Sequence, residues 1–233
     1  MKTSLGILIA FISMTLITCK AQDEVILLDH SIRASDSADS PPLLILLHGL
    51  GSNEADMHQL ANYLDPRFLV ISARAPHLVR ANSYRWYEVD FSSGKPISNK
   101  AEAMQSTEIL KDFIHELKSI YSFDKDKVFI GGFSQGAIMS FDLGFTEPGL
   151  IKGIIALSGR IMDHTKDKIK KRQPSNILII HGTQDRVLPI SYSREAKALL
   201  EESGAALDYH ELEIGHTVNG QTVELINNWL NKQ

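Results

Sequence analysis

Short apolar runs alternate with longer amphipathic stretches along most of the chain. The apolar runs predict strands at residues 24–30, 43–47, 68–72, 127–133, 150–157, 176–180 and 207–212. Between them, apolar residues recur at helical spacing and predict helices at residues 53–64, 99–121, 135–145, 190–203 and 218–230. Runs that are apolar on both faces are typical of parallel strands covered on both sides. The alternation therefore predicts an α/β fold with a mostly parallel central sheet and helices on both faces.

Three segments break this alternation. Residues 31–40 are polar and predict a loop. Residues 77–100 form a long aromatic stretch after a predicted strand end, which indicates a wall of a substrate pocket, with surface packing as the alternative. Residues 160–172 are rich in lysine and arginine, and there a solvated loop or helix face is favoured over a binding patch.

The first 21 residues are predicted to lie outside the folded domain, which leaves residues 22–233 as a single domain. Lys2 precedes the apolar residues 5–17. Because a bilayer-spanning helix needs about 20 apolar residues, this shorter run indicates an export signal rather than an anchor. We therefore expect export across the inner membrane of a bacterium. Cleavage after Ala21 would leave a soluble periplasmic or extracellular protein, whereas lipidation of Cys19 in a lipobox-like Leu-Ile-Thr-Cys would anchor it to a membrane.

The intact mass of the exported protein distinguishes these two outcomes. A soluble chain beginning at Gln22 has the mass of its amino acids alone. A chain beginning at Cys19 carries the additional mass of the attached lipid and partitions with membranes. The full-length mass recovered from the cytoplasm would contradict both.

Composition narrows the classes of function. The chain has 233 residues, 43% of them hydrophobic and 22% charged, with a net charge of −4, so there is no basic surface of the kind that binds nucleic acid. Cys19 is its single cysteine, so the mature domain is expected to have neither a disulfide nor a thiol nucleophile. No H-E-x-x-H motif occurs, and Asp124 and Asp126 are interpreted as a solvated turn. We therefore expect no metal and no cofactor; the oligomeric state is left open.

The clearest chemical motif is Gly132-Phe133-Ser134-Gln135-Gly136, which fits G-x-S-x-G between a predicted strand and a predicted helix. A serine on such a sharp turn needs small neighbours, because side chains two residues to either side would clash. The turn also directs the serine at a helix N-terminus, where free N–H groups favour an oxyanion. Ser134 is therefore the candidate nucleophile.

A serine nucleophile needs a histidine base and a carboxylate, and in this architecture they follow it in the order acid, then histidine. Asp185 follows the strand predicted at residues 176–180, and His216 lies in a glycine-containing loop after the last predicted strand. The other downstream histidines fit less well, since His181 and His210 lie in or beside strands and His164 lies in the charged segment. The predicted catalytic set is Ser134, Asp185 and His216.

An oxyanion hole requires two N–H donors. One is predicted to be the backbone N–H of Gln135, directly after the nucleophile. The second is predicted in the glycine-bracketed turn after residue 47, where we assign the N–H of Leu50, with Gly49 or Gly51 as the alternative.

Four ordered motifs resemble the phospholipase/carboxylesterase family, which includes acyl-protein thioesterases and bacterial carboxylesterases. The similarity extends from about residue 42 to the C-terminus. They are His48-Gly49-Leu50-Gly51, Gly132-Phe133-Ser134-Gln135-Gly136, His181-Gly182-Thr183-Gln184-Asp185-Arg186-Val187-Leu188-Pro189 and Gly215-His216-Thr217-Val218.

The resemblance implies an α/β-hydrolase without a large cap domain that cleaves carboxylic esters or thioesters of small molecules without a cofactor. It carries over the same triad and oxyanion donors, and we add Trp86, Tyr87 and His48 as candidate substrate-binding residues. The sequence departs from the family at Ala137, where many members have a glycine, at residues 84–87, and in its export signal.

Two other functions remain open at this stage. A serine peptidase on the same fold would use the same triad, although such enzymes usually carry additional domains for which this chain has no room. A catalytically inactive binding protein could retain the fold, but binding alone does not require an ordered serine, aspartate and histidine.

Overall fold

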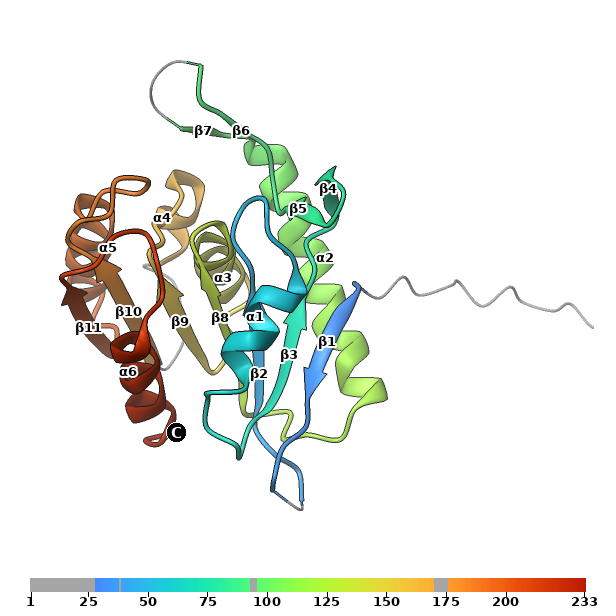
Figure 1. Cartoon of the computed structure of the whole chain (residues 1–233). Coiled ribbons are helices and arrows are strands. Elements are labelled where there is room, and N and C mark those ends of the chain that lie inside the picture. Colours follow the sequence, from blue (N-terminus) through green and yellow to red (C-terminus); the bar gives the residue numbers. More distant parts are fainter. Residues whose placement is uncertain (1–27, 38, 93–95, 170–175) are drawn as a thin grey trace, which may run out of the picture.

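The computed structural model describes residues 28–37, 39–92, 96–169 and 176–233. Within these residues, seven strands form the central sheet in the order β1-β3-β2-β8-β9-β10-β11 (Figure 1). Their bounds are β1 His30–Arg33, β2 Leu43–Leu47, β3 Leu69–Ala73, β8 Val128–Phe133, β9 Gly153–Leu157, β10 Asn176–Gly182 and β11 Leu207–Leu212. Only the edge strand β1 runs antiparallel to its neighbour, and the other neighbouring pairs are parallel. The predicted α/β fold with a mostly parallel sheet is confirmed.

Helices cover both faces of this sheet. They are α1 Glu54–Ala61, α2 Lys100–Ile120, α3 Gln135–Thr146, α4 Asp163–Ile169, α5 Ser191–Glu202 and α6 Gly220–Leu230. Alternate side chains of β2 enter two separate cores. Ile45 belongs to the core that also contains side chains of α2, α3 and α5, and Leu44 belongs to the core that contains side chains of α1 and α6. Every residue of β2 is buried, which explains why its sequence lacks polar alternation.

The aromatic stretch at residues 77–100 is not a plain loop. It contains two short antiparallel ribbons, β4 His77–Arg80 with β5 Ser83–Arg85, and β6 Val89–Asp90 with β7 Ile97–Ser98. The ribbon of β6 and β7 projects beyond the rest of the fold at the top of Figure 1. The charged segment contains α4, in agreement with the predicted loop or helix face, and its residues 170–172 lie outside the described residues.

The first strand was placed wrongly by the sequence. It lies at His30–Arg33 and so extends from the last residue of the predicted strand into the predicted loop, whereas residues 24–27 of the predicted strand lie outside the described residues. As an edge strand, β1 is only partly covered, and Ile32 is 40% exposed. A continuous apolar run is therefore the wrong criterion for it.

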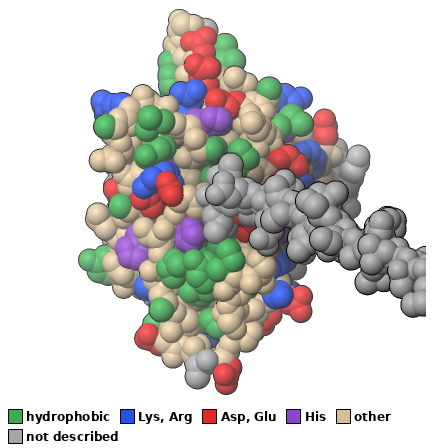
Figure 2. Space-filling view, turned by 90° about the vertical axis from the view of Figure 1, so that its right-hand side faces the viewer, with side chains coloured by type: hydrophobic (Ala, Val, Ile, Leu, Met, Phe, Trp, Pro, Cys, Tyr) green, Lys and Arg blue, Asp and Glu red, His purple; other side chains and the backbone are tan. Residues whose placement is uncertain are grey.

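The predicted export signal, with Cys19 and Ala21, also lies outside the described residues. In the part of the chain that the structure describes, no helix is long and apolar enough to cross a bilayer. Figure 2 views the molecule from the side of β1, where acidic and basic side chains are interspersed and one patch of hydrophobic side chains lies beside histidines.

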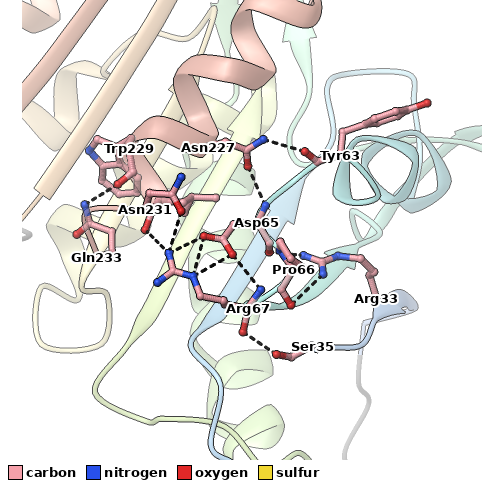
Figure 3. A network of polar contacts seen from close by, with 11 residues as sticks. Arg33, Ser35, Tyr63, Asp65, Pro66, Arg67, Asn227, Trp229, Asn231 and Gln233 are labelled. Atoms are coloured by element: carbon pink, nitrogen blue, oxygen red, sulfur yellow. Dashed lines mark hydrogen bonds and ion pairs between the residues drawn. The ribbon is translucent and has the colours of Figure 1, made fainter. Parts of the chain in front are cut away.

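A polar network closes the sheet at the amino ends of its parallel strands (Figure 3). The buried Asp65 carboxylate accepts hydrogen bonds from the Nε and Nη2 atoms of Arg67, at 3.0 and 2.6 Å to Oδ2. The backbone N–H of Asp65 donates to Asn227 of α6 at 2.8 Å, and its carbonyl accepts from Arg33 of β1 at 2.9 Å. One turn residue thus connects the first strand and the last helix of the described fold.

We predict that Asp65→Asn lowers the free energy of unfolding by about 1–2 kcal/mol at neutral pH, since it weakens a charge-assisted hydrogen bond to a half-exposed arginine. Burial alone would raise the pKa of Asp65, but the hydrogen bonds from Arg67 outweigh it and hold that pKa below its usual value. The contribution is therefore fully present above the unfolded-state pKa of about 3.9 and is lost as pH falls through the lower folded-state pKa. Urea unfolding of both proteins at several pH values measures it.

The exposed Asp126 provides a matched control, and Asp126→Asn should change stability by less than about 0.5 kcal/mol. A difference between wild type and Asp65→Asn that grows toward acid pH would contradict the assignment.

Candidate active site

Ser134 occupies a strained turn between β8 and α3. Its φ of 55° and ψ of −116° lie in a region that residues with side chains rarely adopt. The flanking glycines are sterically required: a Cβ on Gly132 would lie 2.4 Å from the carbonyl carbon of Gly136, and a Cβ on Gly136 would lie 2.1 Å from the carbonyl oxygen of Leu47. The serine therefore stands at the carboxyl end of the sheet, at the start of α3.

Asp185 and His216 are in direct contact at the neighbouring strand ends. His216 Nδ1 lies 2.6 Å from Asp185 Oδ2, while the backbone N–H groups of Val187 and Leu188 donate to Oδ1 at 2.8 and 2.9 Å. Burial opposes ionisation of Asp185, but these hydrogen bonds outweigh it and lower the pKa of the carboxyl. An ionised carboxylate only accepts hydrogen bonds, so His216 carries its proton on Nδ1 and leaves Nε2 as a base.

Ser134, His216, Leu50 and Gln135 line one cavity of about 340 Å³. The His216 ring lies 4.7 Å from the ring of Phe133, the residue before the serine. In the described part of the chain, no hydrogen bond uses the backbone N–H of Leu50 or of Gln135. Apolar side chains, among them Val89 and Phe91 of the projecting ribbon, form much of the wall.

The side chain of Gln135 has a role that the sequence did not indicate. Its Oε1 accepts the backbone N–H of Trp86 at 2.8 Å, and its Nε2 donates to the carbonyl of Tyr87 at 2.8 Å. The residue after the serine therefore holds the aromatic segment against the elbow. One feature of the sequence could have indicated this role. Gln135 is an amide residue at the N-terminus of a buried helix, where its side-chain donors and acceptor need hydrogen-bond partners.

Trp86, a predicted substrate-binding residue, does not lie on this cavity. Its side chain is fully buried and is not among the cavity-lining residues; its Nε1 donates to the carbonyl of His48 at 3.0 Å. A large indole whose N–H pairs with a backbone carbonyl is a packing residue. Tyr87 and His48, the other two candidates, do line the cavity.

His48 holds the turn after β2 in place. Its Nε2 accepts the backbone N–H of Ala75 at 3.0 Å, and its Nδ1 lies 2.8 Å from the carbonyl of Gly49. Burial lowers the pKa of His48, so the ring is neutral, with its proton on Nδ1. The turn that carries Leu50 is thereby fixed beside the serine.

The remaining downstream histidines lie in different places. His164 pairs with Asp142 and His210 with Asp208, both away from the cavity. His181 is closer, with its Nε2 2.8 Å from the carbonyl of Leu188 and 3.4 Å from Asp185 Oδ2.

The cavity wall also includes a positively charged residue. Arg160, which the sequence predicts to lie in a solvated segment, lines the cavity. No cluster of three or more potential metal ligands occurs in the described ranges of the chain.

A parallel sheet with a serine elbow, and a carboxylate-paired histidine at its carboxyl end, defines the chain as an α/β-hydrolase. It belongs to the phospholipase/carboxylesterase family, whose model matches residues 29–233.

Among curated relatives, it is similar to Esterase YpfH of Escherichia coli, with 26% identity over 202 residues that cover 84% of each chain. It is also 31% identical over 192 residues to Acyl-protein thioesterase 1 of Saccharomyces cerevisiae, covering 71% of this chain and 80% of that one. Among solved structures, esterase PE8 has a TM-score of 0.80 at 27% identity, covering 89% of this chain and 99% of that one. The Bacillus cereus carboxylesterase has a TM-score of 0.74 at 27% identity, with coverages of 88% and 94%.

We predict that Gly136→Ala lowers the free energy of unfolding by about 3 kcal/mol or more, because the new methyl group must displace the backbone at the end of β2. Gly149→Ala is the matched control, since a Cβ there meets nothing within 4 Å. Thermal unfolding of both variants measures the difference, and equal stability would show that the contact between α3 and β2 is not tight.

Proposed function

We propose that this chain, a hydrolase of ester or thioester bonds, works through Ser134 as nucleophile, His216 as base and Asp185 as the orienting carboxylate. The observation that carries the proposal is the 2.6 Å contact between His216 Nδ1 and Asp185 Oδ2, beside a cavity that Ser134 shares. Relatives named esterase and acyl-protein thioesterase support the reaction class.

The first half of the reaction forms an acyl-enzyme. His216 Nε2 takes the proton of the Ser134 hydroxyl while Oγ attacks the acyl carbon. Asp185, with its pKa lowered, remains ionised and stabilises the resulting imidazolium. His216 then donates this proton to the leaving alcohol or thiol as its bond to the acyl carbon breaks.

The oxyanion of the tetrahedral intermediate would be bound by the backbone N–H groups of Leu50 and Gln135. Gln135 is the first residue of α3, so the helix dipole adds positive potential at this point. Loss of one such donor typically lowers kcat by about 10²- to 10³-fold.

The second half returns the free enzyme. Water loses a proton to His216 and attacks the acyl carbon, the same N–H groups bind the second oxyanion, and the proton returns to Ser134 as the acid departs. Each turnover therefore consumes one water molecule and one ester or thioester bond, and the proposed steps use no further reactant.

The two alternatives are less well supported. A peptidase must admit a polypeptide, and the described wall over the serine is the small ribbon of β6 and β7 rather than a domain that selects peptides. A binding protein would gain nothing from an ionised Asp185 beneath His216, since burying a charge is costly.

We predict that Ser134→Ala lowers kcat on 4-nitrophenyl esters by at least about 10³-fold and abolishes labelling by a fluorophosphonate. Ser119→Ala, at an exposed serine on α2, is the control and should retain both activities. An acyl-chain series from acetate to decanoate measures the preferred length. Undiminished hydrolysis or labelling in Ser134→Ala would refute the mechanism.

A further inference from the structure

Arg160 lines the cavity that contains Ser134 and His216, and its guanidinium donates a hydrogen bond to Ser98, which lines the same cavity and a neighbouring one. The residue follows β9, which lies between β8 and β10 in the sheet. Because parallel strands present their carboxyl ends at one edge, the arginine emerges next to the serine elbow, on the side of the strands that lead to Asp185 and His216.

The backbone before Arg160 is tightly constrained. Ser158 has a φ of 50°, in the left-handed region, and its N–H donates to the carbonyl of Ile180 at 2.9 Å. A Cβ on Gly159 would lie 2.6 Å from the Cβ of Ala137 in α3, so this segment packs directly on the helix that starts at the elbow. The backbone that leads to Arg160 is therefore held against the same helix that begins at the serine.

The side chain of Arg160 is also held. Its Nη2 donates to the hydroxyl of Ser98, on β7, at 2.8 Å, and the guanidinium carbon lies 5.8 Å from the centre of the Tyr192 ring. A guanidinium has five N–H donors in a planar fork, and Ser98 uses one of them. The head group is thus oriented while donors remain for a ligand.

In the described part of the chain, no carboxylate lies within ion-pair distance of Arg160. Asp163 and Glu195, around a neighbouring cavity, pair with Lys166 at 2.8 and 2.6 Å, and Arg160 contributes only a weaker, longer-range attraction to Asp163. A guanidinium without a hydrogen-bonded carboxylate partner can still bind an anion from outside.

An acidic side chain also lines this cavity. Asp56, near the start of α1, accepts a hydrogen bond from the hydroxyl of Ser52. It lies on the β2 side of the elbow, whereas Arg160 lies on the β9 side. An anionic substrate group would be repelled by Asp56 and attracted by Arg160, which would favour one direction of the substrate in the cavity.

We propose that Arg160 makes this enzyme selective for esters or thioesters that carry an anionic group, a carboxylate or a phosphate, on the part of the substrate that lies toward β9. The guanidinium would bind that group through paired N–H···O hydrogen bonds, and lysine could not reproduce this geometry. The inference rests on the proposed function, because it concerns the substrate of the same site.

Two pairs of esters test the selectivity, each matched in size and differing in one charge. The acyl pair is the 4-nitrophenyl monoester of adipic acid and the same ester of adipic acid monoamide. The alcohol pair is 3-acetoxybenzoate and 3-acetoxybenzamide. The ratio of kcat/KM between anionic and neutral members is measured for wild type, Arg160→Gln and Arg160→Lys; as a ratio within one protein, it is insensitive to the fraction that is folded.

We expect wild type to prefer the anionic member of one pair by about tenfold or more, mainly through KM. The pair that shows this preference identifies the side of the scissile bond that faces β9. Arg160→Gln should remove the preference and Arg160→Lys should retain a small part of it. Lys152→Gln is the control: it removes one positive charge at the opposite end of β9, where the residue is exposed, and should leave the ratio unchanged.

Three results would overturn the inference. The first is equal kcat/KM on both members of both pairs, and the second is a preference for the anionic member that survives in Arg160→Gln. The third is an equal loss of that preference in Lys152→Gln, which would indicate long-range electrostatics. In each case, Ser134-dependent hydrolysis of the neutral esters would leave the proposed function intact. Failure of that function would instead appear as hydrolysis, neutral esters included, that Ser134→Ala does not reduce.

Discussion

The close approach of the first turn of α3 to the carboxyl end of β2 is the constraint on which the site depends. A Cβ on Gly136 would lie 2.1 Å from the carbonyl oxygen of Leu47, so backbone rests directly on backbone. This contact fixes the N-terminus of α3, forces Ser134 into its left-handed conformation and brings the turn with Leu50 beside the N–H of Gln135. The strain at one serine is tolerated because two cores, one on each face of the sheet, hold the strand and the helix.

Stability and chemistry are concentrated at opposite ends of the sheet. At the amino ends of the parallel strands, Asp65 forms hydrogen bonds with Arg33 of β1, with Arg67 and with Asn227 of α6 (Figure 3). At the carboxyl ends, the backbone N–H groups of Leu50 and Gln135 form no hydrogen bond within the described residues, and Arg160 uses one N–H donor for Ser98. Because hydrogen bonds stabilise the fold at the amino end of the sheet, polar groups at the carboxyl end can stay without partners in the protein. A binding site needs such polar groups to orient its ligand.

The sequence predicted the features that depend on chain order and strand ends, and missed those that depend on tertiary packing. Ser134, Asp185 and His216 could be placed at one edge because parallel strands bring their carboxyl ends together. Trp86 could not be placed, since an aromatic residue in a long excursion looks the same whether its ring faces a cavity or fills a core. Arg160 lies in a charged segment that the sequence predicts to be solvated, and only its tertiary contacts, the hydrogen bond to Ser98 among them, bring it to the cavity. The edge strand β1 was missed because partial exposure removes the apolar run on which the prediction relied.

The carboxylate of Asp185 lies near two histidines, His181 and His216, and the two rings differ in burial and in their distance from it. The side chain of His181 is fully buried and lies 3.4 Å from Oδ2, whereas His216 is 15% exposed and lies 2.6 Å from the same atom. Burial lowers the pKa of His181, so its ring stays neutral while Nε2 donates to the carbonyl of Leu188. In the proposed mechanism, a protonated His181 would neutralise part of the carboxylate and weaken its stabilisation of an imidazolium at His216. By keeping the inner histidine neutral, the core leaves the full charge of Asp185 to the histidine that faces the cavity.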